Sequence, residues 1–380
     1  MKAWCKRTLG LLLAMVLLFP ATFAYAEDEH SYAAVYGFQN GLAIVEKHGK
    51  YGYIDTTGKL AIPCQYDKAW YFNNGMAIIT KDGKYGFIDT TGKEVVPCQY
   101  DDASSFSEDL ACVRKEGKYG YVDTTGKEIV PCQYDDASSF REGLARVKKN
   151  GKWGYIDTTG KETLPCKYDA ASSFSEGLAK VKTDWAGASV WGTDGKRDIF
   201  IDTTGKEAFS CQYDEVDAFS EGLAAVEKNG KWGFIDKTGK EVIPCQYDKA
   251  NAFSNGLARV MEDKEYGFVD RTGKKVVPFT YWDAGSFSGG LAWVMKKYDY
   301  GFIDTTGNIV IQLRYDRAWT FSNEGFALVM DIDYGFGFVD INGAEVISCE
   351  YDSAAYGEGY FTLIKDGYLS ILDKDLNRVF

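Results

Sequence analysis

Lys152-Trp153-Gly154-Tyr155-Ile156-Asp157 is the stretch that decides the fold, because its pattern recurs along nearly the whole chain. The pattern is aromatic-Gly-aromatic-(Ile/Val)-Asp, and successive copies lie about 34 residues apart, with one interval of 45. The copies end at Asp55, Asp89, Asp123, Asp157, Asp202, Asp236, Asp270, Asp304 and Asp340, with a degraded copy at Asp373. Ten units therefore fill the chain after its first segment, and no stretch is left for a separate catalytic domain.

Each unit has the pattern of a small β-meander. In the fourth unit, 144–149 and 152–157 are β-prone runs on either side of Asn150-Gly151, which suits the positive φ angles of a two-residue hairpin turn. Asp157-Thr158-Thr159-Gly160 is a second turn, in which the Asp can cap its own backbone. A third run follows this turn, and a short fourth run leads to the next unit. No unit has a helical apolar stripe, which excludes the helical repeats of similar length.

The repeat resembles the WG repeat, also called the KWG repeat, of bacterial exported and surface proteins. The resemblance covers about residues 32–380, although most units have Tyr in place of Trp. The fifth unit has Asp198-Ile199 where the aromatic-Gly pair is expected, so we expect it to be weakened locally. The companion stretch 219–226 fits the family as well. The residues of the two nearest copies that we expect to be structural are Trp153, Gly154, Asp157, Trp232, Gly233 and Asp236. The resemblance implies a binding or structural protein, and no catalytic residues.

These observations predict an all-β repeat array of ten units. Units of about 34 residues are short against the 40–45 of a typical propeller blade, and ten units exceed the usual 4–8 blades. The units are also nearly whole at both ends of the array, whereas many propellers close by splitting one blade between the two chain ends. We therefore expect an open β-solenoid or superhelical stack. The alternative is a β-propeller-like closed ring.

The first segment has the pattern of a secretory signal peptide. Lys2, Lys6 and Arg7 precede a short apolar run, and Ala24-Tyr25-Ala26 fits a small-x-small cleavage site. We expect residues 1–26 to be removed and residues 27–380 to form the array, which would change the formal net charge from −12 to −15. No later stretch is long and apolar enough for a membrane span. The expected location is secreted, extracellular, periplasmic or at the cell surface.

The composition excludes several classes of function. Lys and Arg number 43 against 55 Asp and Glu, so clustered basic residues for a nucleic-acid partner are not expected. The two His argue against histidine-based metal sites, and the repeated turn places a Lys where a calcium loop would need another acid. The sequence shows no catalytic pair outside the repeat consensus. We therefore expect no cofactor, no metal and no enzymatic activity.

Apart from Cys5 in the first segment, the cysteines fall into one repeated slot with one exception. The functional interpretation of the slot is a metal or disulfide ladder, and the structural one is a small buried hydrophobe. Phe279 and Leu313 occupy the slot in two units, which favours the core. The exception is Cys112, whose equivalents include Arg146, so we expect an exposed and reactive thiol. The slot is filled by Cys64, Cys98, Cys132, Cys166, Cys211, Cys245 and Cys349.

Tryptophans outside the consensus are the candidates for binding a ligand or partner. The fifth unit carries an insertion at about 183–197 that contains Trp185 and Trp191, either as a contact loop or folded back onto the array. Trp293 replaces basic residues of other units, so we expect it to face solvent. Trp70 and Trp319 replace serines and are weaker candidates, since they can also fill grooves between units.

The sequence thus predicts a non-enzymatic exported protein that acts as a binding scaffold for an unknown protein or surface. The alternative is a module that binds cell-wall or cell-surface glycans through exposed aromatics. The least favoured interpretation is an envelope enzyme built on a propeller.

Overall fold

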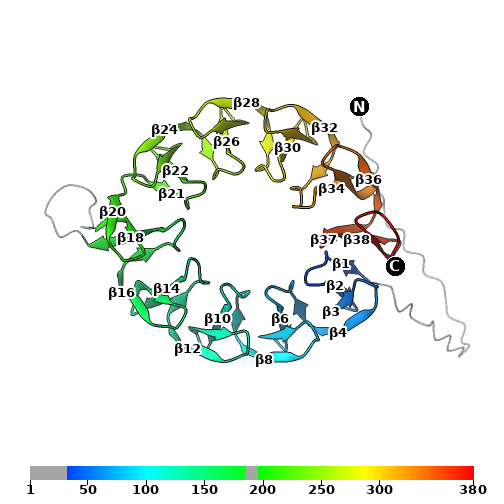
Figure 1. The fold of residues 1–380 in the computed structure, drawn as a ribbon, viewed down its shortest axis with the longest axis horizontal. Helices are drawn as coiled ribbons and strands as arrows, with labels where there is room; N and C mark the ends of the chain where they lie inside the picture. Colours follow the sequence, from blue (N-terminus) through cyan, green and yellow to red (C-terminus); the bar gives the residue numbers. More distant parts are fainter. Residues whose placement is uncertain (1–31, 185–195) are drawn as a thin grey trace, which may run out of the picture.

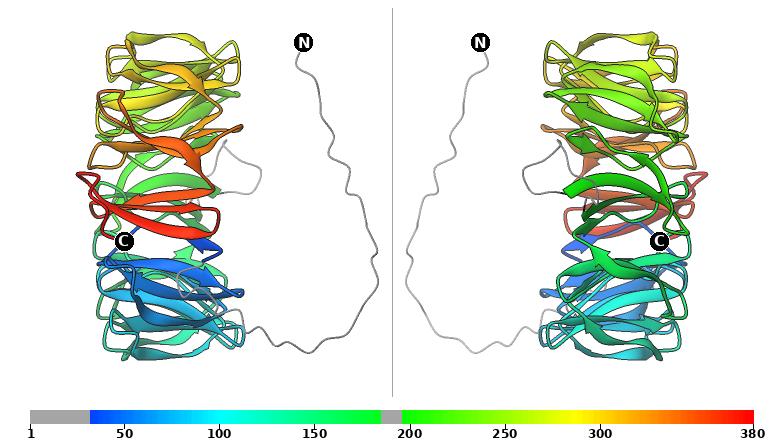
Figure 2. Two further views of the ribbon diagram at one scale, coloured as in Figure 1. Left: turned by 90° about the vertical axis from the view of Figure 1, so that its right-hand side faces the viewer. Right: turned by 90° about the vertical axis from the view of Figure 1, so that its left-hand side faces the viewer.

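The computed structural model describes residues 32–184 and 196–380, which form a closed ring of ten small sheets (Figure 1). Nine blades are four-stranded antiparallel sheets in chain order, and the tenth has three strands. Seen edge-on, the ring is a disc whose strands cross its thickness (Figure 2). The protein is therefore all-β, as expected, and it is a ten-bladed β-propeller. The expected open solenoid is wrong, and the closed-ring alternative is confirmed.

We number the blades 1 to 10 in chain order, so that blade 1 is β1–β4 and blade 10 is β37–β39. The innermost strand is the shortest of each blade, and these strands are β1 (Ala34–Val35), β5 (Lys68–Ala69), β9 (Asp102–Ala103), β13 (Asp136–Ala137), β17 (Ala170–Ala171), β21 (Glu215–Val216), β25 (Lys249–Ala250), β29 (Asp283–Ala284), β33 (Arg317–Ala318) and β37 (Ser353–Gly357). The second strands are β2 (Leu42–Lys47), β6 (Met76–Lys81), β10 (Leu110–Lys115), β14 (Leu144–Lys149), β18 (Leu178–Asp184), β22 (Leu223–Lys228), β26 (Leu257–Glu262), β30 (Leu291–Lys296), β34 (Phe326–Asp331) and β38 (Tyr360–Lys365).

The third strands carry the aromatic-Gly-aromatic motif, and they are β3 (Lys50–Asp55), β7 (Lys84–Asp89), β11 (Lys118–Asp123), β15 (Lys152–Asp157), β19 (Lys196–Asp202), β23 (Lys231–Asp236), β27 (Glu265–Asp270), β31 (Asp299–Asp304), β35 (Gly335–Asp340) and β39 (Tyr368–Asp373). The outermost strands are β4 (Leu60–Tyr66), β8 (Glu94–Tyr100), β12 (Glu128–Tyr134), β16 (Glu162–Tyr168), β20 (Glu207–Ser210), β24 (Glu241–Tyr247), β28 (Lys275–Tyr281), β32 (Ile309–Tyr315) and β36 (Glu345–Tyr351).

Both predicted turns are present. Asn150 and Gly151 have φ angles of 52° and 77°, so the turn between β14 and β15 is the two-residue hairpin that the sequence indicates. In the next turn, Asp157 Oδ1 accepts hydrogen bonds from the backbone N–H groups of Thr159 and Lys161, each at 3.0 Å. The repeated Asp thus caps its own turn, and no ligand is needed to explain its recurrence.

The glycine of the motif is required by the close approach of the outermost strand. A Cβ atom at Gly154 would lie 2.6 Å from the carbonyl oxygen of Leu164 and 2.6 Å from the backbone nitrogen of Cys166. The pairing of β15 with β16 is irregular at this point, because β16 bulges over the glycine. In blade 5 the position is occupied by Ile199, and β20 is only four residues long. The side chain of Ile199 takes the space that the bulge needs, which explains the weakened fifth unit.

The core of the protein is divided among the interfaces between neighbouring blades. Between blades 3 and 4, Leu110 and Tyr121 pack against Ala145, Val147 and Ile156. The side chains of these residues are at most 5% exposed, and equivalent clusters recur around the ring. Since a blade is too small to bury both faces alone, each blade depends on its two neighbours.

The ring closes without sharing a blade between the two ends of the chain. The rings of Phe38 and Tyr360 lie 5.4 Å apart across the junction of blades 1 and 10. Glu358 accepts hydrogen bonds from the backbone N–H groups of Asn40 and Gly41, both at 2.7 Å. The C-terminal Phe380 joins the apolar cluster of the same junction. Whole units at both ends are therefore compatible with closure, because the last interface is built from the same contacts as the others.

Candidate binding surfaces

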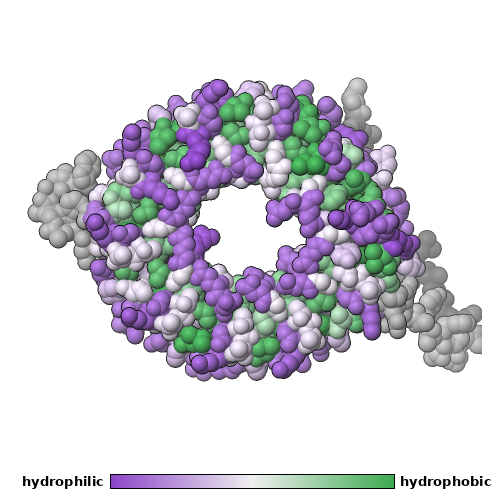
Figure 3. Space-filling view, viewed as in Figure 1, coloured by the Kyte–Doolittle hydropathy of each residue, from purple (hydrophilic) through white to green (hydrophobic). Residues whose placement is uncertain are grey.

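The turns of the blades lie on two opposite faces of the disc. The loops between innermost and second strands share one face with the turns between third and outermost strands, and we call this the loop face. The hairpin turns between second and third strands share the other face with the segments that join one blade to the next. We call this the hairpin face. A central opening, bordered largely by hydrophilic residues, passes between the two faces (Figure 3).

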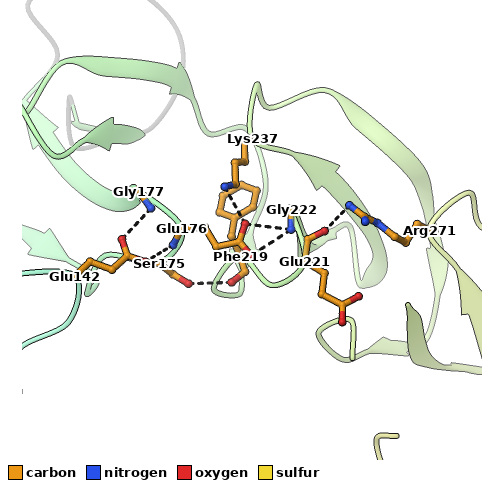
Figure 4. Close-up of polar contacts among 9 residues, drawn as sticks. All are labelled: Glu142, Ser175, Glu176, Gly177, Phe219, Glu221, Gly222, Lys237 and Arg271. Carbon is orange, nitrogen blue, oxygen red and sulfur yellow. Dashed lines mark hydrogen bonds and ion pairs between the residues drawn. The ribbon is translucent and has the colours of Figure 1, made fainter. Parts of the chain in front are cut away.

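On the loop face, a glutamate of each consensus loop is bound by the next blade. Glu142 accepts hydrogen bonds from the backbone N–H groups of Glu176 at 2.6 Å and Gly177 at 2.9 Å (Figure 4). The φ angles of these two residues are 50° and 83°, so their successive N–H groups converge on the carboxylate. Ser175 Oγ donates to the carbonyl oxygen of Phe219 at 2.8 Å. The same carboxylate contact joins Glu108 to Gly143, Glu176 to Gly222, Glu221 to Gly256 and Glu358 to Gly41.

The negative charge of one of these glutamates is balanced by a lysine within the ring. Lys237 Nζ lies 2.9 Å from Glu176 Oε2, and this contact, followed by the N–H group of Gly222, lowers the pKa of Glu176. Arg271 donates a hydrogen bond to the carbonyl oxygen of Glu221 (Figure 4). The carboxylates of the loop face therefore hold adjacent blades together, which is a structural role.

On the hairpin face, the Asp that follows the Tyr of an outermost strand connects two blades at five junctions. Asp101 Oδ1 lies 2.6 Å from Lys84 Nζ of blade 2, and its Oδ2 accepts a hydrogen bond from the N–H group of Glu116 in the hairpin turn of blade 3, at 2.9 Å. The contact with Lys84 is the main cause of the lowered pKa of Asp101. The same lysine pair is formed by Lys50–Asp67, Lys118–Asp135, Lys152–Asp169 and Lys231–Asp248.

Blades 8 and 9 break this pattern with large exposed side chains. Trp282 occupies the slot of the bridging Asp and is 44% exposed. Its ring lies 5.2 Å from that of Tyr298, which is 75% exposed and has a φ angle of 73° in the hairpin turn of blade 8. In the longer turn of blade 9, Ile332 and Tyr334 are 73% and 72% exposed. We call these four residues the apolar patch. The sequence analysis missed it, although the loss of the Asp and of the turn glycine is visible in the repeat alignment.

The tryptophans named from the sequence take different places. Trp185 and Trp191 lie outside the described residues. Trp293 is half-buried, with its ring 5.5 Å from Tyr300, so the expectation that it faces solvent is wrong. Its Nε1 also lies against Gly285, which leaves room for the indole. Trp70 and Trp319 lie at the inner edges of blades 2 and 9, so they do not meet in one site. Trp70 is half-buried against Tyr85, whereas Trp319 is 38% exposed and lies near Phe336.

The consensus tryptophans and the cysteines pack between blades. Trp153 and Trp232 are half-buried against the apolar clusters. The slot cysteines are free thiols that are half-buried against the same kind of cluster: Cys64, Cys98, Cys132, Cys166, Cys211, Cys245 and Cys349. Cys112 is buried, with 6% of its surface exposed, and burial raises the pKa of its thiol to about 12. The expectation of an exposed reactive thiol at Cys112 is therefore wrong.

The part of the chain that the structure describes contains no group of three or more His, Cys, Asp and Glu side chains that could hold a metal ion. It also contains no helix of the length and apolar character that crossing a membrane requires.

A ring of ten consecutive β-meander blades, held by repeated contacts between neighbours, defines a β-propeller repeat protein. The chain belongs to the family described as WG containing repeat, whose model matches ten times, at residues 29–51, 51–85, 85–119, 119–153, 153–184, 200–232, 232–266, 266–298, 300–331 and 336–368. A comparison with curated proteins found no match.

Solved structures of other proteins match the chain at low sequence identity. A crystal structure of a eukaryotic initiation factor has a TM-score of 0.56 at 12% identity, and the match covers 88% of this chain and 97% of that one. The computationally designed Ika8 protein has a TM-score of 0.38 at 16% identity, covering 74% and 95%. BamB from Moraxella catarrhalis has a TM-score of 0.38 at 12% identity, covering 79% and 94%. The first of these supports the propeller fold and nothing further.

Proposed function

We propose that the protein is a non-enzymatic, exported binding scaffold, and that it binds a partner protein through the apolar patch of blades 8 and 9. The observation that carries this proposal is the replacement of a structural Asp by Trp282 beside the exposed ring of Tyr298. At five other junctions the Asp of this slot pairs with a Lys of the preceding blade. Blade 7 has Glu265 at the Lys position, so at this junction both members of the pair are replaced and an indole is exposed. Such an exchange is expected where the surface is needed for recognition.

The backbone of the hairpin turn supports the same interpretation. Tyr298 has a φ angle of 73°, a left-handed conformation that a bulky side chain adopts only at a cost of about 1–3 kcal/mol. In blade 4 the corresponding residue is Gly151, which has no such cost. A strained and exposed aromatic residue, paired with a second one, points to a binding surface rather than to packing.

The chemistry of the patch fits a protein partner. Its four large side chains come from two adjacent blades and are flanked in the chain by Lys297, Asp299 and Asp333. Aromatic side chains surrounded by a charged rim are typical of protein–protein interfaces.

The proposal that the protein is not an enzyme is supported by the structural contacts of its acidic side chains. Asp157 caps a turn, Asp101 bridges two blades, and Glu142 binds the next loop. These carboxylates are occupied by backbone N–H groups. Export is supported by the charged, apolar and small-residue pattern of residues 1–26.

The test uses variants that restore the consensus. The purified protein and its Trp282→Asp/Tyr298→Gly variant are immobilised and exposed to envelope and culture-medium fractions of the producing cells, with chemical cross-linking. The matched control is Trp319→Ser, which restores the consensus Ser at an exposed Trp away from the hairpin face. We expect at least one protein to be retained by the wild type and the control and lost by the double variant. Equal retention by all three proteins would contradict the apolar patch as the docking surface.

A further inference from the structure

A second surface departs from the consensus on the loop face, where the two ends of the array meet. In blades 3 to 6 the loops carry the glutamates that bind the next blade. In blades 1 and 2 the corresponding residues are Gln39-Asn40 and Asn73-Asn74, and blade 9 has Asn323 beside Glu324. Side-chain amides thus replace the carboxylate in the loops of blades 1 and 2, whereas Glu324 and Glu358 keep it in blades 9 and 10.

These loops line a cleft. A cavity of about 650 Å³ is bordered by loop residues of blades 9, 10, 1 and 2. A second cavity of about 380 Å³ adjoins it and shares Gln39, Phe72 and Asn73 with it. We call these two neighbouring cavities together the seam cleft. Its volume is in the range of small-molecule binding sites.

In the seam cleft, the polar side chains that make no hydrogen bond to a described residue include uncharged amides. Glu358 is occupied by the N–H groups of blade 1, and Glu324 accepts hydrogen bonds from Tyr356 Oη and from the N–H group of Gly359. By contrast, a set of exposed side-chain amides makes no hydrogen bond to any described residue: Gln39, Asn40, Asn74 and Asn323. No Lys or Arg is among the described residues that border either cavity.

Aromatic rings stand at one side of the same cleft. Tyr71 borders the smaller cavity and is 40% exposed. The ring of Tyr36, 38% exposed, lies edge-on to it at 6.4 Å. The equivalents of Tyr71 in blades 3 and 4 are Ser105 and Ser139, so the tyrosine is specific to this sector of the ring.

We infer that the seam cleft binds a neutral oligosaccharide. A side-chain amide offers both a donor and an acceptor, which matches a sugar hydroxyl, whereas an anionic ligand would call for Lys or Arg. Tyr71 supplies a flat apolar surface for the C–H face of a sugar ring, together with a polar edge. This site is independent of the apolar patch, because the two lie on opposite faces. It places the glycan-binding alternative at the amide loops, where Trp70 also borders the smaller cavity, and not at Trp293 or Trp319.

The test measures binding of soluble neutral hexasaccharides. Maltohexaose, cellohexaose, laminarihexaose and chitohexaose are titrated by calorimetry and by saturation-transfer NMR into the wild type, Tyr71→Ala and Asn74→Ala. The matched control is Asn255→Ala, which removes the equivalent amide in blade 7, far from the cleft. Thermal unfolding verifies that each variant is folded.

We expect at least one of these sugars to bind, with affinity reduced about tenfold by Tyr71→Ala or Asn74→Ala and unchanged by Asn255→Ala. Three results would overturn the inference: no binding of any sugar at millimolar concentration, equal binding by the cleft variants and the wild type, or preferential binding of an anionic oligogalacturonate or of unstructured peptides. None of these results would affect the apolar patch, which is tested with a protein partner.

Discussion

The junction of blades 1 and 10 is the place where a single substitution should act on the ring as a whole. Glu358 holds the N–H groups of Asn40 and Gly41, at 2.7 Å each, across an interface that no peptide bond spans. Glu142 makes the same two contacts with Glu176 and Gly177, but blades 4 and 5 are also joined by the chain. The two glutamates are therefore matched in local chemistry and differ in connectivity.

The expected loss can be estimated from these contacts. A hydrogen bond to a charged acceptor contributes about 1.5–3 kcal/mol when it is shielded, and solvent exposure of the Glu358 carboxylate reduces this to about 0.5–1 kcal/mol for each bond. We expect Glu358→Ala and Glu142→Ala each to lower the free energy of unfolding by about 1–2 kcal/mol. Glu358→Gln keeps one acceptor oxygen and should lose about half as much.

Hydrogen exchange separates the two variants. In Glu358→Ala, amides of β1, β2 and β38 should exchange faster than in the wild type, because the junction opens without stretching the chain. In Glu142→Ala, acceleration should stay confined to the loop at Glu176. Guanidinium unfolding gives the free energies, and mass spectrometry of peptides from both junctions gives the exchange rates. The reasoning would be refuted by equal exchange patterns at the two junctions, or by an unchanged free energy of unfolding in Glu358→Ala.

Three further predictions concern single side chains. Tyr298→Gly removes a bulky residue at positive φ and should raise the free energy of unfolding by about 1 kcal/mol in guanidinium titrations, whereas a destabilised variant would show that the turn is not strained. Cys112, with its thiol pKa raised to about 12 by burial, should react with Ellman's reagent at neutral pH only after unfolding; mapping of fast labelling to Cys112 in the folded protein would contradict this. The hydrogen bond from Thr306 lowers the pKa of Asp304 to about 2, against about 3.9 in the unfolded chain, so its stabilising contribution is present above about pH 4 and is lost as the pH falls toward 2. Asp304→Asn should therefore flatten the dependence of unfolding free energy on pH in that window, and an unaltered slope would speak against it.

Local features were predictable because they depend on a few adjacent residues. The hairpin turn at Asn150-Gly151 and the capping Asp157 follow from backbone preferences, and both are present. The curvature of the array could not be derived in the same way. It depends on small tilts between packed blades, repeated ten times, and no residue of a single unit encodes whether the last blade meets the first.

The predicted exposure of Cys112 and Trp293, which lie on second strands, is wrong for a different reason. The equivalents of Cys112 include Arg146, and an arginine normally indicates a solvent-facing position. Here the guanidinium of Arg146 lies 4.9 Å from the ring of Trp153, and its stem fills the space between blades. Trp293 fills the corresponding space over Tyr300. Polar and aromatic side chains are thus interchangeable at this half-buried position, so its equivalents do not reveal its exposure.

Closure of the ring brings together departures from the consensus that lie far apart in the sequence. Along the sequence, Asn74 and Asn323 lie near opposite ends of the chain, and nothing connects them. In the ring they border one cavity, because blades 1 and 2 follow blades 9 and 10. The seam cleft can therefore exist only while the junction at Glu358 is closed. If the cleft binds an oligosaccharide, the ligand should slow exchange at that junction in the wild type, because it binds the closed ring and not the open one.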